Sequence, residues 1–226
     1  MIGRFRRYAR ENGTRAAVAK TAAELRRRAF SANTITILLK DFDDVKVPRR
    51  PSELEVVAME EAHLPGLSEL NRRRGRPGVD RRFKADLERG LHGFVALLGG
   101  EVVGYYWWVE GERFATHPDA RWLGDSFQIE PGDVYGSDNY LLPEARGGGT
   151  ANHFLFGIES SIAALGYHRI WGYVESGNRE ARWLYSSRGY EPMRDVSVRT
   201  VFSRRLEATP YRPLSKRPPS RNRIDQ

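Results

Sequence analysis

Residues 146–149 read Arg-Gly-Gly-Gly and stand between an apolar run, 133–142, and a helix-like segment that begins near Thr150. Three consecutive glycines are costly to order, because glycine loses more backbone entropy on folding than any other residue. Without Cβ atoms, they let an anion approach the N–H groups at a helix N-terminus, where the helix dipole also favours negative charge. Arg146 adds a fixed charge and a donor fork. The stretch predicts a phosphate-binding turn; the alternative is a flexible turn that only starts a helix.

The turn is neither of two common nucleotide-binding motifs. No Lys-Ser/Thr pair follows the glycines, as a P-loop requires, and there is no G-x-G-x-x-G early in a βαβ unit. The turn therefore predicts a ligand that carries phosphate but does not indicate which class of phosphate-bearing ligand it is. The chain has no cysteine, which excludes disulfides, thiolate metal sites and an acyl-cysteine intermediate.

Hydrophobic periodicity predicts the elements that must position this turn. Two apolar runs within residues 92–111 are joined by Gly99-Gly100, which predicts a two-residue β-hairpin. Residues 112–132 lack a clean period and form a long insert, of the kind that often serves as a binding loop. Further strands are expected at 34–42, 53–60, 133–142 and 167–174, a final strand pair at 190–206, and helices at 61–75, 79–90, 149–166 and 178–189.

Two motifs in this layout resemble those of the GCN5-related N-acetyltransferases. PEARGGGTA is similar to that family's R/Q-x-x-G-x-G/A motif, matched by Arg146, Gly149 and Ala151. NREARWLYSSRGY resembles its N-x-x-A-x-x-L-Y-x-x-x-G-F/Y block, matched by Asn178, Ala181, Leu184, Tyr185, Gly189 and Tyr190. The resemblance covers about residues 53–206. It implies an α/β (α+β) fold with a mixed, mostly antiparallel central sheet, flanked by helices and splayed at the cofactor site.

The resemblance also implies roles for individual residues. The strand end at Leu141 and Leu142 would pair its backbone with the pantetheine arm of acetyl-CoA, and Asn178 would contact that arm from the partner strand. Tyr185 would be the general acid that protonates the departing thiolate; the alternative is a packing aromatic. Arg146 and the following backbone amides would bind the pyrophosphate, and those amides belong to Gly147, Gly148, Gly149, Thr150 and Ala151.

The general base is left open by the sequence. An amine acceptor is mostly protonated at neutral pH, so some group must remove its proton. Asp138 is the favoured candidate because it precedes the pocket-side end of its strand, and Glu175 lies just past the next strand. Asp133 and His117 are further candidates. For each of the four, a solvated side chain or turn former is the alternative.

The acceptor is expected between the 112–132 insert and the helices at 61–90. Trp107 and Trp108 are neighbours on one strand and should point to opposite faces, so at least one belongs to the core. Several aromatic side chains are available to stack against a sugar or a flat amine: Trp107, Trp108, Phe114, Trp122 and Phe127.

Charge separates a central domain from two basic ends. The formal net charge is +8, and residues 1–30 hold nine Arg and Lys against two Glu. They predict a basic N-terminal helical segment that could dock an acidic carrier protein or an anionic surface. Residues 31–50 are expected to be a strand and linker, 51–206 the acetyltransferase-like domain, and 207–226 a basic, Pro-rich disordered tail. No apolar run could span a bilayer, so a cytoplasmic location is the default, and a homodimer is a further option.

Together these features predict an acetyl-CoA-dependent N-acetyltransferase. The acceptor would be a primary amine of a small molecule, such as an amino sugar or amino acid derivative, attacking directly in a ternary complex. Acetyl-CoA is expected as co-substrate, and no metal is expected. Two alternatives remain: an N-acyltransferase with a longer acyl donor or an acyl carrier protein, and a non-catalytic CoA-binding or interaction module with basic tails.

Overall fold

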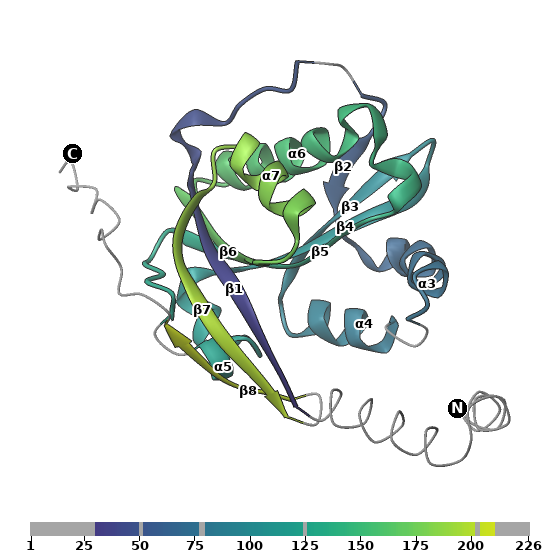
Figure 1. The fold of residues 1–226 in the computed structure, drawn as a ribbon. Coiled ribbons are helices and arrows are strands. Elements are labelled where there is room, and N and C mark those ends of the chain that lie inside the picture. The colour runs from purple at the N-terminus through teal and green to yellow at the C-terminus, as the bar shows by residue number, and fades with distance from the viewer. Residues whose placement is uncertain (1–29, 50–51, 77–79, 124–125, 202–203, 211–226) are drawn as a thin grey trace, which may run out of the picture.

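The computed structural model describes residues 30–49, 52–76, 80–123, 126–201 and 204–210. Its centre is an open eight-stranded sheet with the order β2-β3-β4-β5-β6-β1-β7-β8 (Figure 1). In chain order the strands are β1 (Phe30–Asp41), β2 (Glu55–Ala58), β3 (His92–Leu98), β4 (Glu101–Glu110), β5 (Asp133–Leu141), β6 (Arg169–Glu175), β7 (Glu191–Val201) and β8 (Arg204–Pro210). All neighbours pair antiparallel except β5 and β6, so the sheet is mixed and mostly antiparallel, as expected.

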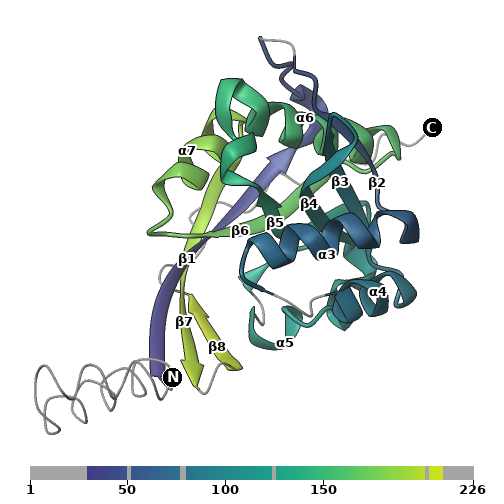
Figure 2. The same ribbon diagram turned by 90° about the vertical axis from the view of Figure 1, so that its right-hand side faces the viewer.

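Helices cover both faces of the sheet. Helices α6 and α7 lie on one face, and α3, α4 and α5 lie on the other (Figures 1 and 2). The helices are α3 (Leu64–Arg73), α4 (Asp80–Glu88), α5 (Ala120–Leu123), α6 (Thr150–Ala164) and α7 (Arg179–Ser187). Short 3-10 turns complete the described elements: η1 (Phe42–Asp44), η2 (Glu61–His63), η3 (Gly111–Thr116), η5 (Pro143–Ala145) and η6 (Gly147–Gly149). Among the described residues, none of these helices has the length and apolar character needed to cross a membrane.

The β3–β4 hairpin turns at the predicted pair of glycines. Gly99 (φ 58°) and Gly100 (φ 82°) both have the positive φ angles that such a turn requires. Trp107 and Trp108 point to opposite faces of β4, and both are buried. Trp107 packs edge-on against Phe83 of α4. The hairpin therefore contributes to the core on both faces of the sheet.

Strand β1 lies in the interior of the sheet, between β6 and β7. Ile35 pairs with Glu175 on one side and with Val196 on the other. Its alternating side chains serve both layers: Ile35 packs with α5, and Leu38 packs into the core beneath α6. Residues 31–50 were expected to form a strand and linker ahead of the domain, whereas in the structure this strand belongs to the central sheet.

The chain ends fall partly outside the described residues. The basic segment at 1–30, with its proposed carrier or surface contact, lies outside them except for its last residue. Residues 207–210 were expected to begin a disordered tail, but they belong to β8, which pairs with β7. The final strand pair is therefore present and extends further than predicted, because its pairing with β7 satisfies the backbone there.

A buried ion cluster joins β1, α6 and the residue that follows α7. Glu159 is 0% exposed, and its carboxylate pairs with Lys40, at 3.4 Å between Oε2 and Nζ, and with Arg188. Lys40 also donates to the backbone carbonyl of Arg188. Arg188 closes the last turn of α7 by donating its backbone N–H to Leu184 O and Tyr185 O. The cluster therefore fixes the C-terminal end of α7 to the sheet and to α6.

Replacing Glu159 by alanine is expected to reduce the free energy of unfolding by about 3–5 kcal/mol, because the change leaves two buried cations without their carboxylate partner. Urea denaturation measures the loss. Glu88→Ala, at an exposed position at the end of α4, is the matched control and should change stability by no more than about 0.5 kcal/mol. Equal effects of the two substitutions would contradict a stabilising role for the cluster.

Candidate functional site

The glycine turn joins the end of β5 to the first turn of α6. Gly148 (φ 63°) and Gly149 (φ 92°) have left-handed backbone conformations, which favour glycine. Gly147 has no such angle, and a Cβ added to any of the three would meet no atom within 4 Å. Neither backbone strain nor packing requires glycine at position 147. A side chain there would only occupy the open space before the N-terminus of α6.

The first turn of α6 has the features of an anion site. The Thr150 N–H donates to Gly147 O, whereas the N–H groups that follow it in this turn have no acceptor one turn earlier in the helix. The N-cap residue, Gly149, offers no side chain to bind them, and no acidic residue stands in the first turn. The Thr150 hydroxyl donates to Gly147 O at 2.7 Å and so holds the turn closed. Exposed N–H groups without a competing carboxylate favour a phosphate here.

The end of β5 differs in detail from the expected pantetheine contact. Leu142 N–H donates to Val103 O at 2.8 Å, so this donor is committed to β4. Alternate residues of an antiparallel strand direct their backbone groups to opposite sides, and Leu141 therefore turns its N–H toward β6. Arg146 lies back along the strand, with its Nε donating to Leu141 O at 3.0 Å. Of the two leucines, only Leu141 has a backbone N–H that points away from β4 and so could donate to a ligand.

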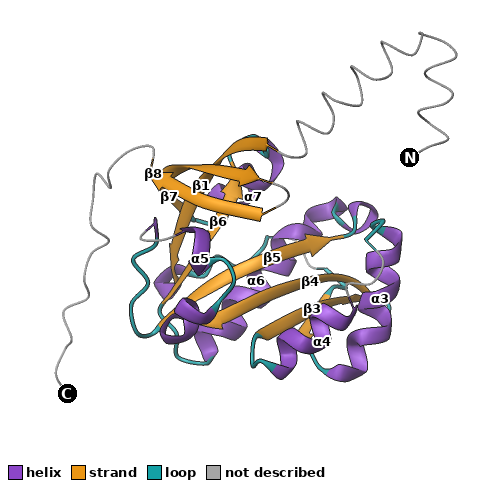
Figure 3. Cartoon of the chain, turned by 90° about the horizontal axis from the view of Figure 1, so that it is seen from below, coloured by secondary structure: helices purple, strands orange, loops and turns teal. Residues whose placement is uncertain are grey.

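Strands β5 and β6 pair only at their first residues. Their parallel ladder ends where Tyr135 lies opposite Trp171, after which β5 continues along β4 and β6 along β1. Figure 3 shows the β3–β5 group and the β1–β7 group running apart. A glycine follows on each strand, Gly136 on β5 and Gly172 on β6. A Cβ added at Gly172 would lie 3.5 Å from Gly136 O. The expected splay therefore begins at residue 136.

Tyr185 projects from α7 back to this opening. Asn139 Nδ2, on the β5 segment that no longer pairs with β6, donates to the Tyr185 hydroxyl at 3.2 Å. The Tyr190 ring packs edge-on against Tyr185, with 4.8 Å between centroids. Burial raises the pKa of Tyr185; the Asn139 hydrogen bond lowers it and the Glu159 charge raises it, and the net change is upward. The phenol therefore stays protonated at neutral pH and can donate a proton.

Sequence reasoning missed two polar neighbours of this opening. One is Asn139, and the polar run Ser137–Asn139 inside an otherwise apolar strand is the signal that could have identified it. The other is Tyr106, whose hydroxyl oxygen lies 1.8 Å from where a Cβ on Gly136 would stand. Gly136 is therefore needed for Tyr106 to lie against β5. No sequence signal distinguishes Tyr106, because it sits within the apolar run of the hairpin.

Asn178 is the N-cap of α7. Its Oδ1 accepts from Ala181 N–H at 3.1 Å, and its own N–H donates to Glu175 O at 2.8 Å. The side chain therefore starts the helix that carries Tyr185. The Nδ2 group and the second lone pair of Oδ1 remain available for contact with a bound ligand.

The two candidate bases of the sequence analysis lie on different strands. Asp138 sits at the register shift between β4 and β5 and has φ 32°, an uncommon angle for a residue other than glycine. Its carboxylate pairs with Arg82 of α4 at 2.5 Å and accepts from the Tyr105 hydroxyl at 3.3 Å. Asp138 therefore faces α4, while its neighbour Asn139 faces α7. Glu175 is exposed at the end of β6.

Asp133 is held in a structural ion pair. It is 1% exposed, binds Arg169 at 2.7 Å and accepts from Trp171 Nε1 at 2.9 Å. Because the acceptor amine cannot reach so deeply buried a carboxylate, we exclude it as the general base; Asp138 is also ion-paired, but its side chain is 27% exposed. The expected aromatic floor for the acceptor is also wrong for four of its five members, because they pack in the core; these are Trp107, Trp108, Trp122 and Phe127.

His117 is buried within the insert. Its Nδ1 accepts from Asp119 N–H at 3.1 Å, and its Nε2 lies 3.4 Å from the Ser137 hydroxyl. Burial lowers the pKa of His117; the nearby Asp119 and Asp86 raise it, Arg82 lowers it, and the net change is downward. The folded protein therefore favours the neutral ring.

The stabilising effect of a neutral His117 should be lost as pH falls below about 6.5, the ordinary histidine pKa, because the unfolded chain then binds a proton that the folded chain disfavours. We expect His117→Asn to show a smaller drop in unfolding free energy than the wild type between about pH 7.5 and about pH 5. Urea denaturation at both pH values measures this. A drop of equal size in the variant would exclude His117 as the cause.

Within the ranges that the structure describes, no three His, Asp or Glu side chains are grouped so as to hold a metal ion. Comparison with known protein families and with curated proteins finds no match.

Comparison with solved structures finds the same architecture at low sequence identity. The glucosamine N-acetyltransferase region of a fungal multi-domain GH3 beta-N-acetylglucosaminidase gives a TM-score of 0.58 at 16% identity, over 80% of this chain and 22% of that one. A GCN5-related N-acetyltransferase from Sphaerobacter thermophilus gives 0.55 at 16% identity, over 83% and 58%. A functionally unknown conserved protein from Staphylococcus epidermidis gives 0.53 at 10% identity, over 78% and 64%. The chain spans less than two thirds of each of these structures, and at such identities the likeness shows a shared fold.

Proposed function

We propose that this chain, which has the fold of the GCN5-related N-acetyltransferases, transfers an acetyl group from acetyl-CoA to a primary amine of a small molecule. The acceptor class is an amino sugar or an amino acid derivative. The reaction is direct attack of the amine within a ternary complex, which suits a chain without cysteine. No metal takes part in the proposed step.

One observation carries the proposal: the Tyr185 hydroxyl contacts Asn139 on the open part of the strand that leads into the glycine turn. A single strand thus connects a proton donor with an anion site. The residues present suit acetyl-CoA, since the turn offers N–H groups and open space to a pyrophosphate, and Leu141 offers a backbone donor to the amide-bearing arm. We assign pyrophosphate binding to Arg146 and to the backbone N–H groups of Gly147, Gly148, Gly149 and Ala151, since the Thr150 N–H already donates to Gly147 O.

The proposed step needs one acid and one base. The amine nitrogen attacks the thioester carbon, a C–N bond forms and the C–S bond breaks. The amine proton passes to a base, and the departing thiolate takes the proton of Tyr185. Asp138 is the proposed base. Because its carboxylate faces α4 whereas Asn139 faces α7, the acceptor would approach from the α4 side, opposite the phenol.

Asp138→Asn is expected to lower the turnover number about 100-fold, within the usual ~10²–10⁴-fold range of general acid–base catalysis. Asparagine tolerates the positive φ at this position, so the backbone should be retained. Glu175→Gln is the matched control and should leave turnover near that of the wild type. Steady-state rates of thiol release measure both. A large loss in Glu175→Gln alone would instead make Glu175 the base.

The function as a whole is tested in two stages. Isothermal titration of the full chain with acetyl-CoA tests donor binding, and a screen of amine acceptors with detection of released thiol tests transfer. We expect saturable binding and turnover with at least one amino sugar or amino acid derivative. Absence of acetyl-CoA binding would refute the proposal. Binding without transfer to any amine would favour the non-catalytic alternative.

A further inference from the structure

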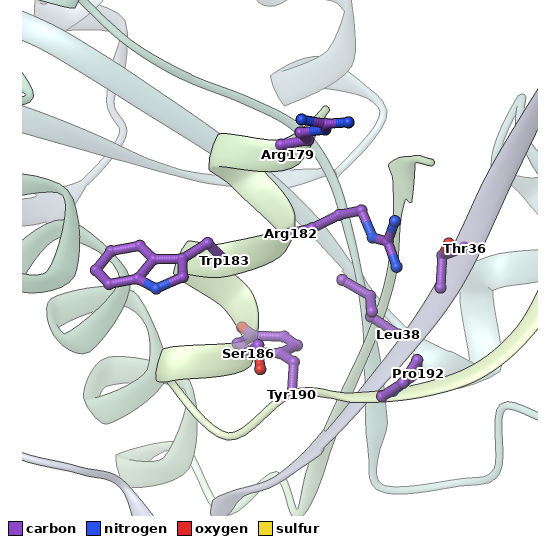
Figure 4. Close-up of a pocket in the computed structure, with 8 residues that line it drawn as sticks. All are labelled: Thr36, Leu38, Arg179, Arg182, Trp183, Ser186, Tyr190 and Pro192. Atoms are coloured by element: carbon purple, nitrogen blue, oxygen red, sulfur yellow. The ribbon is translucent and has the colours of Figure 1, made fainter. Parts of the chain in front are cut away.

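A pocket lies between α7, β1 and β7 (Figure 4). Its volume is about 330 Å³, at the lower end of the range for small-molecule sites. None of its lining residues belongs to the proposed donor turn or provides the proposed acid or base. The lining residues are Thr36, Leu38, Arg179, Arg182, Trp183, Ser186, Tyr190 and Pro192.

The floor of this pocket is apolar with one polar end. Leu38 of β1 pairs directly with Pro192 of β7, next to a register shift between the two strands. Tyr190 is 5% exposed and adds its ring to the floor, while Thr36 supplies a hydroxyl. The Thr36 hydroxyl donates to Asp195 Oδ1 at 2.7 Å and already accepts from the Ser176 hydroxyl at 3.1 Å, so only its second lone pair remains for another group.

The opposite wall is positively charged. Arg179, Arg182 and Ser186 recur at spacings of three and four residues and so share one face of α7. In Figure 4, the Arg182 guanidinium extends toward Thr36 and Leu38, and its Nη1 donates to Ser176 O at 3.1 Å. In the described part of the chain no carboxylate pairs with either arginine, and none lines the pocket. Two guanidinium groups over an apolar floor favour a ligand with an anionic head.

We infer that this pocket binds a small carboxylate with an apolar body. The planar fork of Arg182 matches a carboxylate in geometry and charge, and the Ser186 hydroxyl can donate a further hydrogen bond. The apolar body of the ligand packs on the exposed Pro192 ring, beside the nearly buried Leu38, and removes the apolar surface of Pro192 from water. The limited volume suits a single ring or a branched aliphatic group.

The position of the pocket makes its ligand an effector of the proposed active site. Tyr190 lines the pocket and also packs edge-on against Tyr185 at 4.8 Å. Arg182 and Ser186 belong to the same helix as Tyr185. A bound ligand therefore contacts both the helix and the ring that position the phenol. This effect rests on the proposed function, whereas binding itself does not.

Benzoate is the probe, and benzamide is its neutral counterpart of similar shape. In isothermal titration of the full chain, we expect benzoate to bind at least about tenfold more tightly than benzamide, because a carboxylate has the negative charge and the two acceptor oxygens that pair with a guanidinium, whereas the amide is neutral and has one. Ser186→Trp, which fills the pocket from an exposed position, should abolish binding. Ser187→Trp, its exposed neighbour outside the lining, should not. Arg182→Gln should weaken benzoate about tenfold.

Several results would overturn the inference. These are no benzoate binding by the wild type, equal binding of benzamide, or equal effects of the two tryptophan substitutions. Displacement of benzoate by CoA would place the pocket inside the donor site. If benzoate binds but leaves acetyl-CoA affinity and turnover unchanged, the effector role is refuted, since coupling between two sites is reciprocal. If acetyl-CoA fails to bind while benzoate binds, the proposed function fails and the pocket stands.

Discussion

Phenylalanine in place of Tyr185 is expected to lower the turnover number for acetyl transfer about 100-fold, while the KM for acetyl-CoA changes little. The substitution removes only the hydroxyl, whose described partner is Asn139 Nδ2 at 3.2 Å. Burial and the Glu159 charge raise the pKa of this phenol, so the wild type has a proton available for the thiolate at neutral pH and the variant does not. Steady-state thiol release at saturating amine measures the difference.

Tyr190→Phe is the matched control for this result. Within the described residues the Tyr190 hydroxyl is buried without a hydrogen-bond partner, so its removal should leave turnover unchanged and stability unchanged or higher. Wild-type turnover in Tyr185→Phe would transfer the acid role to another group. An equal loss in both variants would attribute the effect to packing of the two rings rather than to proton transfer.

Leucine at position 147 is expected to weaken acetyl-CoA binding about 100-fold or more, the equivalent of two charge-assisted hydrogen bonds at ~1.5–3 kcal/mol each. The side chain would project into open space before α6, where the pyrophosphate is proposed to contact the backbone. Because Gly147 has no left-handed φ and no packing neighbour, folding should be unaffected. Isothermal titration gives the affinity, and thermal unfolding confirms the unchanged fold.

Two further substitutions separate ligand exclusion from backbone strain. Gly147→Ala adds only a Cβ and should weaken binding less than leucine. Gly149→Val has to adopt φ 92° and should also lower the melting temperature, since left-handed backbone costs roughly 1–2 kcal/mol in other residues. Unchanged affinity in Gly147→Leu would mean that this turn does not seat the donor.

The parts of the fold that depend on neighbouring residues could be predicted from the sequence. The Gly99-Gly100 pair determines its hairpin locally, and Asn178 caps α7 through a bond to a residue only three positions away. The glycine turn follows the same rule, because a run of glycines before a helix restricts the backbone by itself. The order of helices and strands from residue 53 to the final strand pair was therefore predictable, except for η3 and α5, which lie in the insert without a clean period.

The parts that depend on distant residues could not be predicted. The alternation of side chains predicts a strand at Thr34–Phe42, but it does not indicate which strands lie next to it in the sheet. For the same reason the sequence does not reveal that Lys40 meets Glu159 and Arg188, 119 and 148 residues later. At the site, the register shift at Asp138 decides which of two adjacent polar residues faces α7, and such a shift has no local pattern.

The placement of β1 also has a consequence for how the protein acquires its structure. The Thr36 side chain bonds to Ser176 and Asp195, 140 and 159 residues further along the chain. Pairings over such separations form slowly, because a long loop must close before any contact stabilises it. Within the sheet, β7 and β8 reach β6 only through β1. The β4–β5 side of the opening can assemble from strands that follow each other in the chain, whereas the side that carries Tyr185 is completed only when β1 pairs with β6 and β7.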